Sequence, residues 1–247
     1  MTPRWVPPAV TLAVRAALAL LLPAEPRWDG YFYARYARSL ADGLGYVDLY
    51  PRGPRPTAFY PVGYPAALSA ALRVVTDPQR AVVALNLVAS LVACLAAMAL
   101  GQRLGDRRTA VRAGLVYALL PGPALWCLAA MTETLTGALL ALGVAMLLRG
   151  WDRRPAETPP PSPAGALSVT VLGGFVLGLA ALVRPPSLAL LVAPLALRGP
   201  WPRRLAFAVL LGLGAALAVA PWTARNCARL DACALVSTNG GSNLLIG

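Results

Sequence analysis

The sequence predicts an all-α fold, a polytopic bundle of about seven transmembrane helices with interfacial helices in its first outer loop. Hydrophobic residues make up 58% of the 247 positions and charged residues only 13%, about half the share typical of soluble domains. The apolar residues also form runs near the roughly 20 residues that a helix needs to cross a bilayer. A polytopic membrane protein is therefore expected.

Seven apolar segments meet or approach that length, namely residues 6–22, 82–100, 113–130, 134–148, 167–183, 186–197 and 205–221. The first is expected to be a retained anchor rather than a cleaved signal peptide, because Arg15 interrupts it and no small-residue cleavage motif follows. The third and fourth are so close in sequence that we expect a tight hairpin around residues 121–123. Segment 186–197 is short, so we expect it to be tilted, re-entrant or joined to its neighbour through the turn at 184–186.

The arginines set the expected orientation, because basic residues of short loops are retained on the cytoplasmic side. All 22 basic residues are arginine. If the spans alternate, one side receives Arg4, Arg103, Arg107, Arg108, Arg112, Arg149, Arg153, Arg154, Arg198, Arg203 and Arg204. That side is expected to be the cytoplasm. The N-terminus is then on the cytoplasmic side of the plasma membrane, and the C-terminus is on the outer side. The proline-rich linker 155–163 then lies inside, whereas loop 24–80 and tail 222–247 face outward.

The composition also excludes several classes of function. The net charge is +12, but the arginines lie in short clusters between apolar runs, which argues against a nucleic-acid partner. There is no His, which excludes a His-based nucleophile, a His proton shuttle and most zinc sites. Acid and base chemistry must therefore use Asp, Glu, Tyr or Cys, and nothing in the sequence requires a metal or another cofactor.

The four cysteines are too scattered for a disulfide scaffold and contain no CxxC pair. Cys227 and Cys233 lie on the expected outer side, where oxidation permits a disulfide if the segment turns back on itself. In a continuous helix, however, their separation of six positions points the two side chains to different faces. We therefore expect free thiols unless the chain turns there.

The outer loop 24–80 contains two stretches with helical spacing. Residues 28–44 carry several aromatic side chains that favour the headgroup layer, so this helix is expected to lie flat on the membrane. Two glycines end it. Residues 51–65 are rich in Pro, Gly and aromatics and predict an irregular connection. Residues 66–75 predict a second interfacial helix, because they are too few to span the bilayer.

Two carboxylates are candidates for a functional site. Asp29 begins the surface helix, where a helix N-terminus favours an acid, so plain capping is the alternative to a functional role. Glu133 lies at the outer end of segment 134–148, beside an apolar wall and without a basic residue near it in sequence. Such an acid costs free energy unless it finds a partner or a wet cavity. A functional acid and an ordinary capped helix start are equally open for Glu133.

Several motifs occur in a fixed order along the chain. The outer loop carries DGYFY at 29–33, ADGLGY at 41–46 and PTAFYPVGYP at 56–65. The remainder carries Glu133, LVRP at 182–185, APWTARN at 220–226 and STNGGSNL at 237–244. As an ensemble, these motifs resemble the GT-C glycosyltransferases of the protein mannosyltransferase and aminoarabinose transferase type. The resemblance covers the whole chain, although each motif alone is weak.

This resemblance implies an inverting membrane glycosyltransferase that moves a sugar from a polyprenyl-phosphate donor to a lipid, glycan or protein acceptor on the outer face. The carboxylate that opens the outer loop acts as base in such enzymes. Some relatives carry a Lys before the loop proline to contact the lipid phosphate, and Tyr60 stands at that place here. The implied site residues are the catalytic Asp29 and Glu133 and the donor-binding Tyr33, Tyr60, Arg184 and Arg225.

Two other functions stay open. Many spans with a buried acid and arginines also suit a transporter or flippase for an amphipathic lipid. Against this, no inverted repeat is visible, and the polar residues gather in the outer loops. A non-catalytic or truncated subunit is the third interpretation, because relatives of the family continue past the point that matches Gly247. We therefore expect residues 1–247 to be a single GT-C-like membrane domain and the amino-terminal portion of a longer enzyme.

Overall fold

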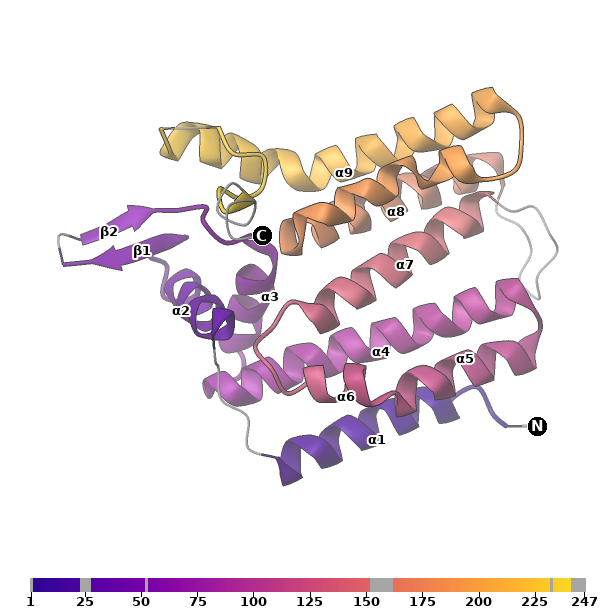
Figure 1. Cartoon of the computed structure of the whole chain (residues 1–247), viewed down its shortest axis with the longest axis horizontal. Helices are drawn as coiled ribbons and strands as arrows, with labels where there is room; N and C mark the ends of the chain where they lie inside the picture. Colours follow the sequence, from indigo (N-terminus) through magenta and orange to yellow (C-terminus); the bar gives the residue numbers. More distant parts are fainter. Residues whose placement is uncertain (1, 23–27, 52, 152–161, 232, 241–247) are drawn as a thin grey trace.

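The computed structural model of the chain describes residues 2–22, 28–51, 53–151, 162–231 and 233–240. Most of these residues are helical, and the long helices run side by side along one axis (Figure 1). Within these described ranges, four helices are long and apolar enough to cross a membrane. They are α4 (Pro78–Leu104), α7 (Glu133–Trp151), α8 (Pro163–Val183) and α9 (Trp201–Arg229). A helical membrane protein, as the composition predicts, is thus supported by the structure.

The other predicted spans are shorter or interrupted. Helix α1 (Val6–Leu21) has 16 residues and rises about 24 Å. Segment 113–130 is divided, because α5 (Arg107–Leu119) ends before the helix α6 (Pro121–Trp126) begins. The hairpin predicted at residues 121–123 is therefore wrong. Proline needs no N–H in a first helical turn, so Pro121 starts a helix, and the connection to α7 lies at residues 127–132.

The segment after α8 forms a 3₁₀ helix, η1 (Pro185–Ala196). At about 2.0 Å per residue, its 12 residues cover about 24 Å, whereas an α-helix of the same length covers about 18 Å. It packs against both α8 and α9, and it returns the chain from the end of α8 to the start of α9 (Figure 1). The tighter winding therefore lets a short apolar segment cross most of the bundle.

Helices α8 and α9 approach each other closely through small residues. A Cβ placed on Gly174 would collide with the backbone of Leu211, and one on Gly214 would collide with the carbonyl of Val171. A Cβ placed on Gly178 would lie 2.7 Å from the carbonyl oxygen of Ala215. Such glycine contacts let two backbones pack together where lipid offers no hydrophobic driving force between helices.

One end of the bundle carries a cap made by the predicted outer loop (Figure 1). It contains α2 (Asp29–Ala41) and α3 (Gly63–Leu72), and between them the hairpin of β1 (Val47–Tyr50) and β2 (Gly53–Pro56). Both helices that were predicted for this loop are present, although α3 begins three residues before the predicted 66–75. The all-α prediction missed the hairpin, because the GPRP sequence of β2 resembles a loop. Both strands of an isolated hairpin are edges, where proline is tolerated.

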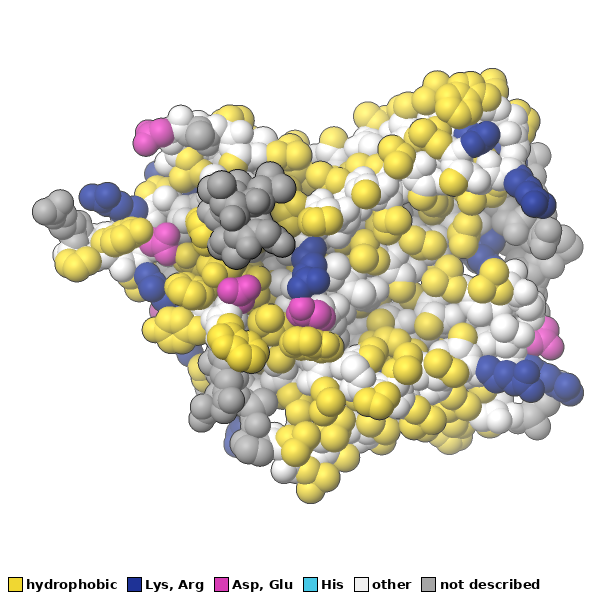
Figure 2. Space-filling model, in the orientation of Figure 1, with side chains coloured by type: hydrophobic (Ala, Val, Ile, Leu, Met, Phe, Trp, Pro, Cys, Tyr) yellow, Lys and Arg dark blue, Asp and Glu magenta, His cyan; other side chains and the backbone are white. Residues whose placement is uncertain are grey.

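The charged side chains gather at the two ends of the bundle, and the face between them is mostly apolar or neutral (Figure 2). The end opposite the cap holds the N-terminus, the α4–α5 turn and the start of α9 (Figure 1). Most of the arginines predicted to share one side are found there. Arg153, Arg154 and residues 155–161 of the predicted linker lie outside the described residues, as do residues 241–244 of the last motif.

Helix α9 continues beyond the predicted span 205–221 and ends at Arg229. The chain then turns back, so that Asn226 donates a hydrogen bond of 3.0 Å to the carbonyl of Ala234. This reversal brings Cys227 and Cys233 together, and the two form a disulfide. The expectation of free thiols is therefore wrong, because the helix ends between the two cysteines.

Candidate functional site

Asp29 lies in the first turn of α2. Its Oδ1 accepts a hydrogen bond of 3.0 Å from the hydroxyl of Tyr60, which follows it by 31 positions. The chain enters the helix through Trp28, whose φ of 48° is unusual for a residue with a side chain. The side chain of Trp28 is exposed. Asp29 is thus a first-turn acid, as the capping alternative predicts, but its carboxylate is also held by a side chain from a distant segment.

Glu133 begins α7 and is paired with Arg184, the residue that follows α8. Arg184 donates from a terminal nitrogen to Glu133 Oε1 at 2.5 Å and from Nε to Thr132 Oγ1 at 2.7 Å. The second carboxylate oxygen, Oε2, is buried and has no hydrogen-bond partner among the described residues. The acid therefore has the basic partner that its neighbours in sequence lack, and it keeps one oxygen available as an acceptor.

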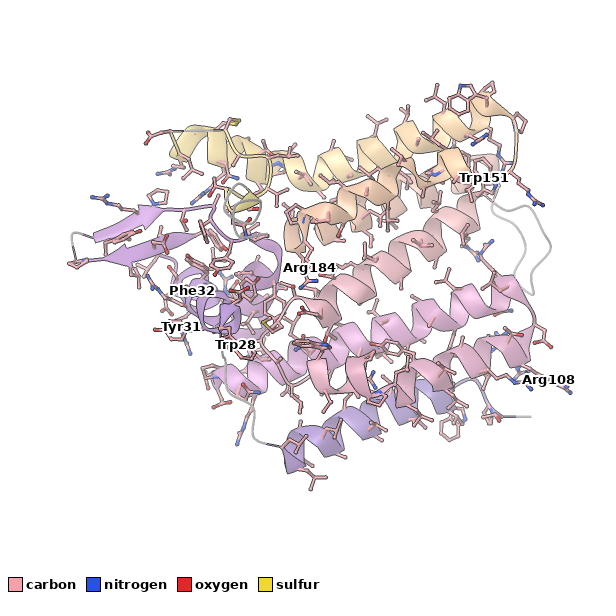
Figure 3. All side chains as sticks on the ribbon, in the orientation of Figure 1. Trp28, Tyr31, Phe32, Arg108, Trp151 and Arg184 are labelled. Atoms are coloured by element: carbon pink, nitrogen blue, oxygen red, sulfur yellow. A yellow bond between two sulfur atoms is a disulfide. The ribbon has the colours of Figure 1, made fainter. Side chains whose placement is uncertain are left out.

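Tyr33 interacts electrostatically with Asp29 and with the pair of Glu133 and Arg184. Its ring packs edge-on against Tyr60, with 5.4 Å between centroids, and it is buried within the cap. Burial raises the pKa of the Tyr33 hydroxyl above its ordinary value, the charge of Asp29 raises it further, and Arg184 opposes the shift. The hydroxyl thus lies within electrostatic range of Asp29, Glu133 and Arg184 at once. Figure 3 shows Arg184 at the end of the bundle that also carries Trp28, Tyr31 and Phe32.

Tyr60 forms the centre of an aromatic cluster. Phe32 stacks on its ring with 5.4 Å between centroids, and Phe59 contacts it edge-on. Burial and the hydrogen bond to Asp29 raise the pKa of Tyr60 to about 12. The hydroxyl therefore keeps its proton at any physiological pH and remains a hydrogen-bond donor to the carboxylate.

Polar residues of α4 hold the connection that leads into Glu133. Asn86 is fully buried and donates to the carbonyls of Cys127 and Ala129, at 3.1 and 2.9 Å. Gln79 donates to the carbonyl of Leu128 at 3.1 Å. These bonds satisfy backbone groups that have no helical partner, so they fix the path of residues 127–132 and with it the start of α7.

Close backbone contacts join the cap to this connection and to α8. A Cβ on Gly30 would lie 2.9 Å from the carbonyl oxygen of Ala130, and one on Gly63 would lie 2.6 Å from the carbonyl carbon of Leu182. A larger residue at either position would force the backbones apart. The two glycines therefore keep Asp29 close to the Glu133 and Arg184 pair.

Arg225 has a different environment from the other predicted site residues. Its guanidinium donates to the carbonyls of Tyr46 and Thr57, at 2.7 and 2.8 Å, and lies over the ring of Trp222. These bonds tie the end of α9 to the outer loop. Four of the six predicted residues form direct pairs, Asp29 with Tyr60 and Glu133 with Arg184. The ring of Tyr33 packs against Tyr60, whereas Arg225 joins two segments of backbone.

An apolar cavity of about 400 Å³ extends from Glu133 between α4, α6 and α7. Its other lining residues are small or apolar along most of its length and include Ala93, Leu100, Trp126 and Ala141. The α7 residues that line the cavity extend from Glu133 to Ala141, and α7 runs along the bundle axis (Figure 1), so the cavity extends from Glu133 into the apolar part of the bundle. It has the dimensions and chemistry that suit part of a lipid chain.

Sequence reasoning missed the residues that position the site. Asn86 interrupts an otherwise apolar predicted span, and an isolated amide at that depth is itself a signal of an interhelical contact. Thr132 gave no such signal, because its role depends on Arg184, 52 positions away. Within the described residues, no three Cys, Asp or Glu side chains are grouped as metal ligands would be.

A scan against models of known protein families finds no match to the chain. A search of curated proteins also finds no significant match.

Proposed function

We propose that this chain is a membrane glycosyltransferase that takes a sugar from a polyprenyl-phosphate donor. The observation that carries the proposal is the ion pair of Arg184 and Glu133, at 2.5 Å, whose carboxylate lines an apolar cavity. A lipid-linked donor has the same order of parts, because its chain lies in the bilayer, its phosphate at headgroup level and its sugar beyond. The family resemblance of the ordered motifs points to the same donor.

In this proposal Asp29 is the general base. The carboxylate removes the proton of the acceptor hydroxyl as its oxygen attacks the anomeric carbon of the sugar, and the bond from that carbon to the phosphate oxygen breaks. The leaving polyprenyl phosphate takes the electron pair of that bond. Tyr60 orients the carboxylate through its hydrogen bond of 3.0 Å. Configuration at the anomeric carbon is inverted, because attack and departure occur on opposite faces.

Arg184 is the proposed ligand of the leaving phosphate. A guanidinium offers a fork of donors that fits phosphate oxygens, and about half of this side chain is exposed, at 49%. Glu133 holds Arg184 in place through Oε1, and its second oxygen, Oε2, is buried without a hydrogen-bond partner among the described residues. Arg225 is proposed to support the loop rather than to bind phosphate, because its donors already bind backbone carbonyls.

The proposed topology places all seven apolar elements across the membrane, including η1 and the broken α5–α6 pair. The end rich in arginine faces the cytoplasm and the cap faces outward. Exposed aromatic side chains of the cap, Trp28, Tyr31 and Phe32, support a position at the lipid headgroups. The plasma membrane is the proposed location.

The test is transfer of labelled sugar by the purified full chain in liposomes, with a panel of polyprenyl-phosphate sugars and a membrane-lipid extract as acceptor. Asp29→Asn is expected to lower the rate by about a hundredfold to ten-thousandfold, the range attributed to a general base. Asp42→Asn is the matched control, because Asp42 is an exposed acid at the other end of α2. Equal rates in Asp29→Asn and the unmodified chain would remove Asp29 from the mechanism.

A lipid transporter is the second candidate, favoured by the cavity that leads from an ion pair into the apolar part of the bundle. The two functions differ in their products. A transporter moves fluorescent polyprenyl-phosphate sugar between leaflets with the bond to phosphate intact, whereas the transferase releases polyprenyl phosphate. Absence of both activities across the panel would favour a non-catalytic subunit.

A further inference from the structure

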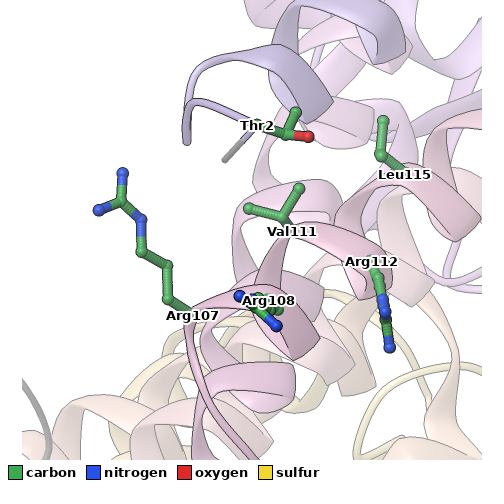
Figure 4. Close-up of a pocket in the computed structure, with 6 residues that line it drawn as sticks. All are labelled: Thr2, Arg107, Arg108, Val111, Arg112 and Leu115. Carbon is green, nitrogen blue, oxygen red and sulfur yellow. The ribbon is translucent and has the colours of Figure 1, made fainter.

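A second cavity lies at the end of the bundle opposite Glu133 and Arg184. Its volume is about 400 Å³, and the described residues that line it are Thr2, Arg107, Arg108, Val111, Arg112 and Leu115. Figure 4 shows Thr2 of the N-terminal segment on one side and the side chains of α5 on the other. Three arginines and two aliphatic residues thus line one concave surface, and the side chains of Arg107 and Arg112 point in different directions (Figure 4).

The positive charge of this cavity is offset in part by Asp106, which interacts electrostatically with Arg108. Arg107, Arg108 and Arg112 are exposed, and none of their guanidinium groups forms a hydrogen bond or a salt bridge within the described part of the chain. The nearest acid is Asp106, which caps α5 by accepting from the backbone and hydroxyl of Thr109, at 2.8 and 3.0 Å. The Asp106 carboxylate thus already binds backbone amides at the start of α5, those of Arg108 and Thr109, so an anion here would bind the arginine side chains.

The lining changes from charged to apolar along α5. Arg107 and Arg108 lie in its first turn, Val111 is buried one turn on, and Leu115 is half-buried one turn further. Residues four apart lie on the same face of a helix, so Arg107, Val111 and Leu115 form one stripe. Because α5 runs along the bundle axis, the charged part lies at the end of the bundle and the apolar part lies deeper (Figure 1).

We propose that this cavity binds an anionic phospholipid, with its phosphate among the three arginines and an acyl chain along Val111 and Leu115. Forked donors bind phosphate oxygens in pairs, and basic recesses between membrane helices attract anionic headgroups. The aliphatic wall distinguishes this ligand from free phosphate, which gains nothing from apolar contact. This site is independent of the proposed sugar transfer, since it lies at the opposite end of the bundle.

The test titrates the full chain, purified in a neutral detergent, with palmitoyl-oleoyl phosphatidylglycerol and measures retained lipid by native mass spectrometry. Phosphatidylcholine with the same acyl chains is the neutral comparison, and inorganic phosphate is the comparison without a lipid tail. We expect at least tenfold tighter retention of phosphatidylglycerol than of phosphatidylcholine. The triple variant Arg107→Gln, Arg108→Gln, Arg112→Gln is expected to weaken it on the order of a hundredfold, about fivefold for each arginine.

A matched control removes three exposed arginines near the cap, Arg55→Gln, Arg73→Gln and Arg80→Gln, and is expected to change retention less than threefold. A second variant, Leu115→Trp, keeps all three charges but fills the apolar wall, and it is expected to weaken retention about tenfold. Equal retention of the two lipids, or equal losses in the two triple variants, would overturn the proposal. Displacement of phosphatidylglycerol by millimolar inorganic phosphate would also overturn it, in favour of a free phosphate site.

Discussion

The guanidinium of Arg15, in α1, donates a hydrogen bond of 3.0 Å to the carbonyl oxygen of Ala118, near the end of α5. A second bond of 3.3 Å goes to the carbonyl of Tyr117, whose ring lies beneath the guanidinium. In a continuous helix, these carbonyls would accept from residues 121 and 122. Pro121 has no N–H and starts a new helix, so a fully buried arginine supplies the missing donors.

The first prediction follows from this exchange of donors. Arg15→Met keeps much of the volume of the side chain but leaves two buried carbonyls without a partner, which costs about 2 to 4 kcal/mol. We therefore expect a marked fall in the free energy of unfolding, measured by denaturant titration of the purified chain in detergent. Arg80→Met is the control, because Arg80 is exposed at the start of α4.

A double-mutant cycle tests whether Arg15 stabilises the bundle by replacing the N–H that Pro121 lacks. Pro121→Ala restores an N–H that can donate to the carbonyl of Tyr117, so the cost of Arg15→Met should be smaller in that background. Additive effects of the two changes would show that Arg15 stabilises the bundle in some other way.

The second prediction compares how much the rate of sugar transfer depends on Glu133 and on Asp29. Glu133→Gln keeps a hydrogen bond to Arg184 but removes the charge that fixes the guanidinium, so the rate of sugar transfer should fall about tenfold to a hundredfold. Asp29→Asn should cost more, because it removes the proposed base itself. The two variants are compared in the same liposome assay. A larger loss of rate in Glu133→Gln than in Asp29→Asn would make Glu133 the better candidate for the general base.

The third prediction concerns the orientation of Asp29, the proposed base, by Tyr60. Tyr60→Phe removes the hydrogen bond to Asp29 and keeps the aromatic packing, so we expect about a tenfold loss of rate. Tyr36→Phe is the matched control, because its hydroxyl binds Asp48 at 2.7 Å. The pKa of Tyr60 is raised to about 12, so its hydroxyl remains a donor up to pH 10. A rate that falls with an apparent pKa near 8 would have to arise from another group.

The sequence predicts the elements of this fold better than the pairs that join them. Runs of apolar residues and aromatic spacing reveal the helices, because helix formation depends on near neighbours and on burial of one face. The pair of Glu133 and Arg184 spans 51 positions, and no local pattern encodes it. The resemblance to a family suggested both residues, but their contact could only come from the packed structure.

The errors of prediction have local physical causes. The sequence did not predict the hairpin of β1 and β2, because its second strand contains two prolines. The disulfide was disfavoured because a continuous helix was the reference, whereas α9 ends between Cys227 and Cys233. In both places the chain reverses direction, and a reversal depends on contacts with segments that are distant in sequence.

The last prediction tests the proposed orientation in intact cells. Arg55→Cys places a thiol on the hairpin of the cap, and Arg108→Cys places one at the opposite end of the bundle, where Figure 3 labels Arg108. Native cysteines give little background, because Cys94 and Cys127 are buried and the other two are bridged. A membrane-impermeant maleimide should label Arg55→Cys in intact cells and Arg108→Cys only after permeabilisation. The reverse pattern would place the arginine-rich end outside and the candidate site in the cytoplasm, where the charge distribution argues against it.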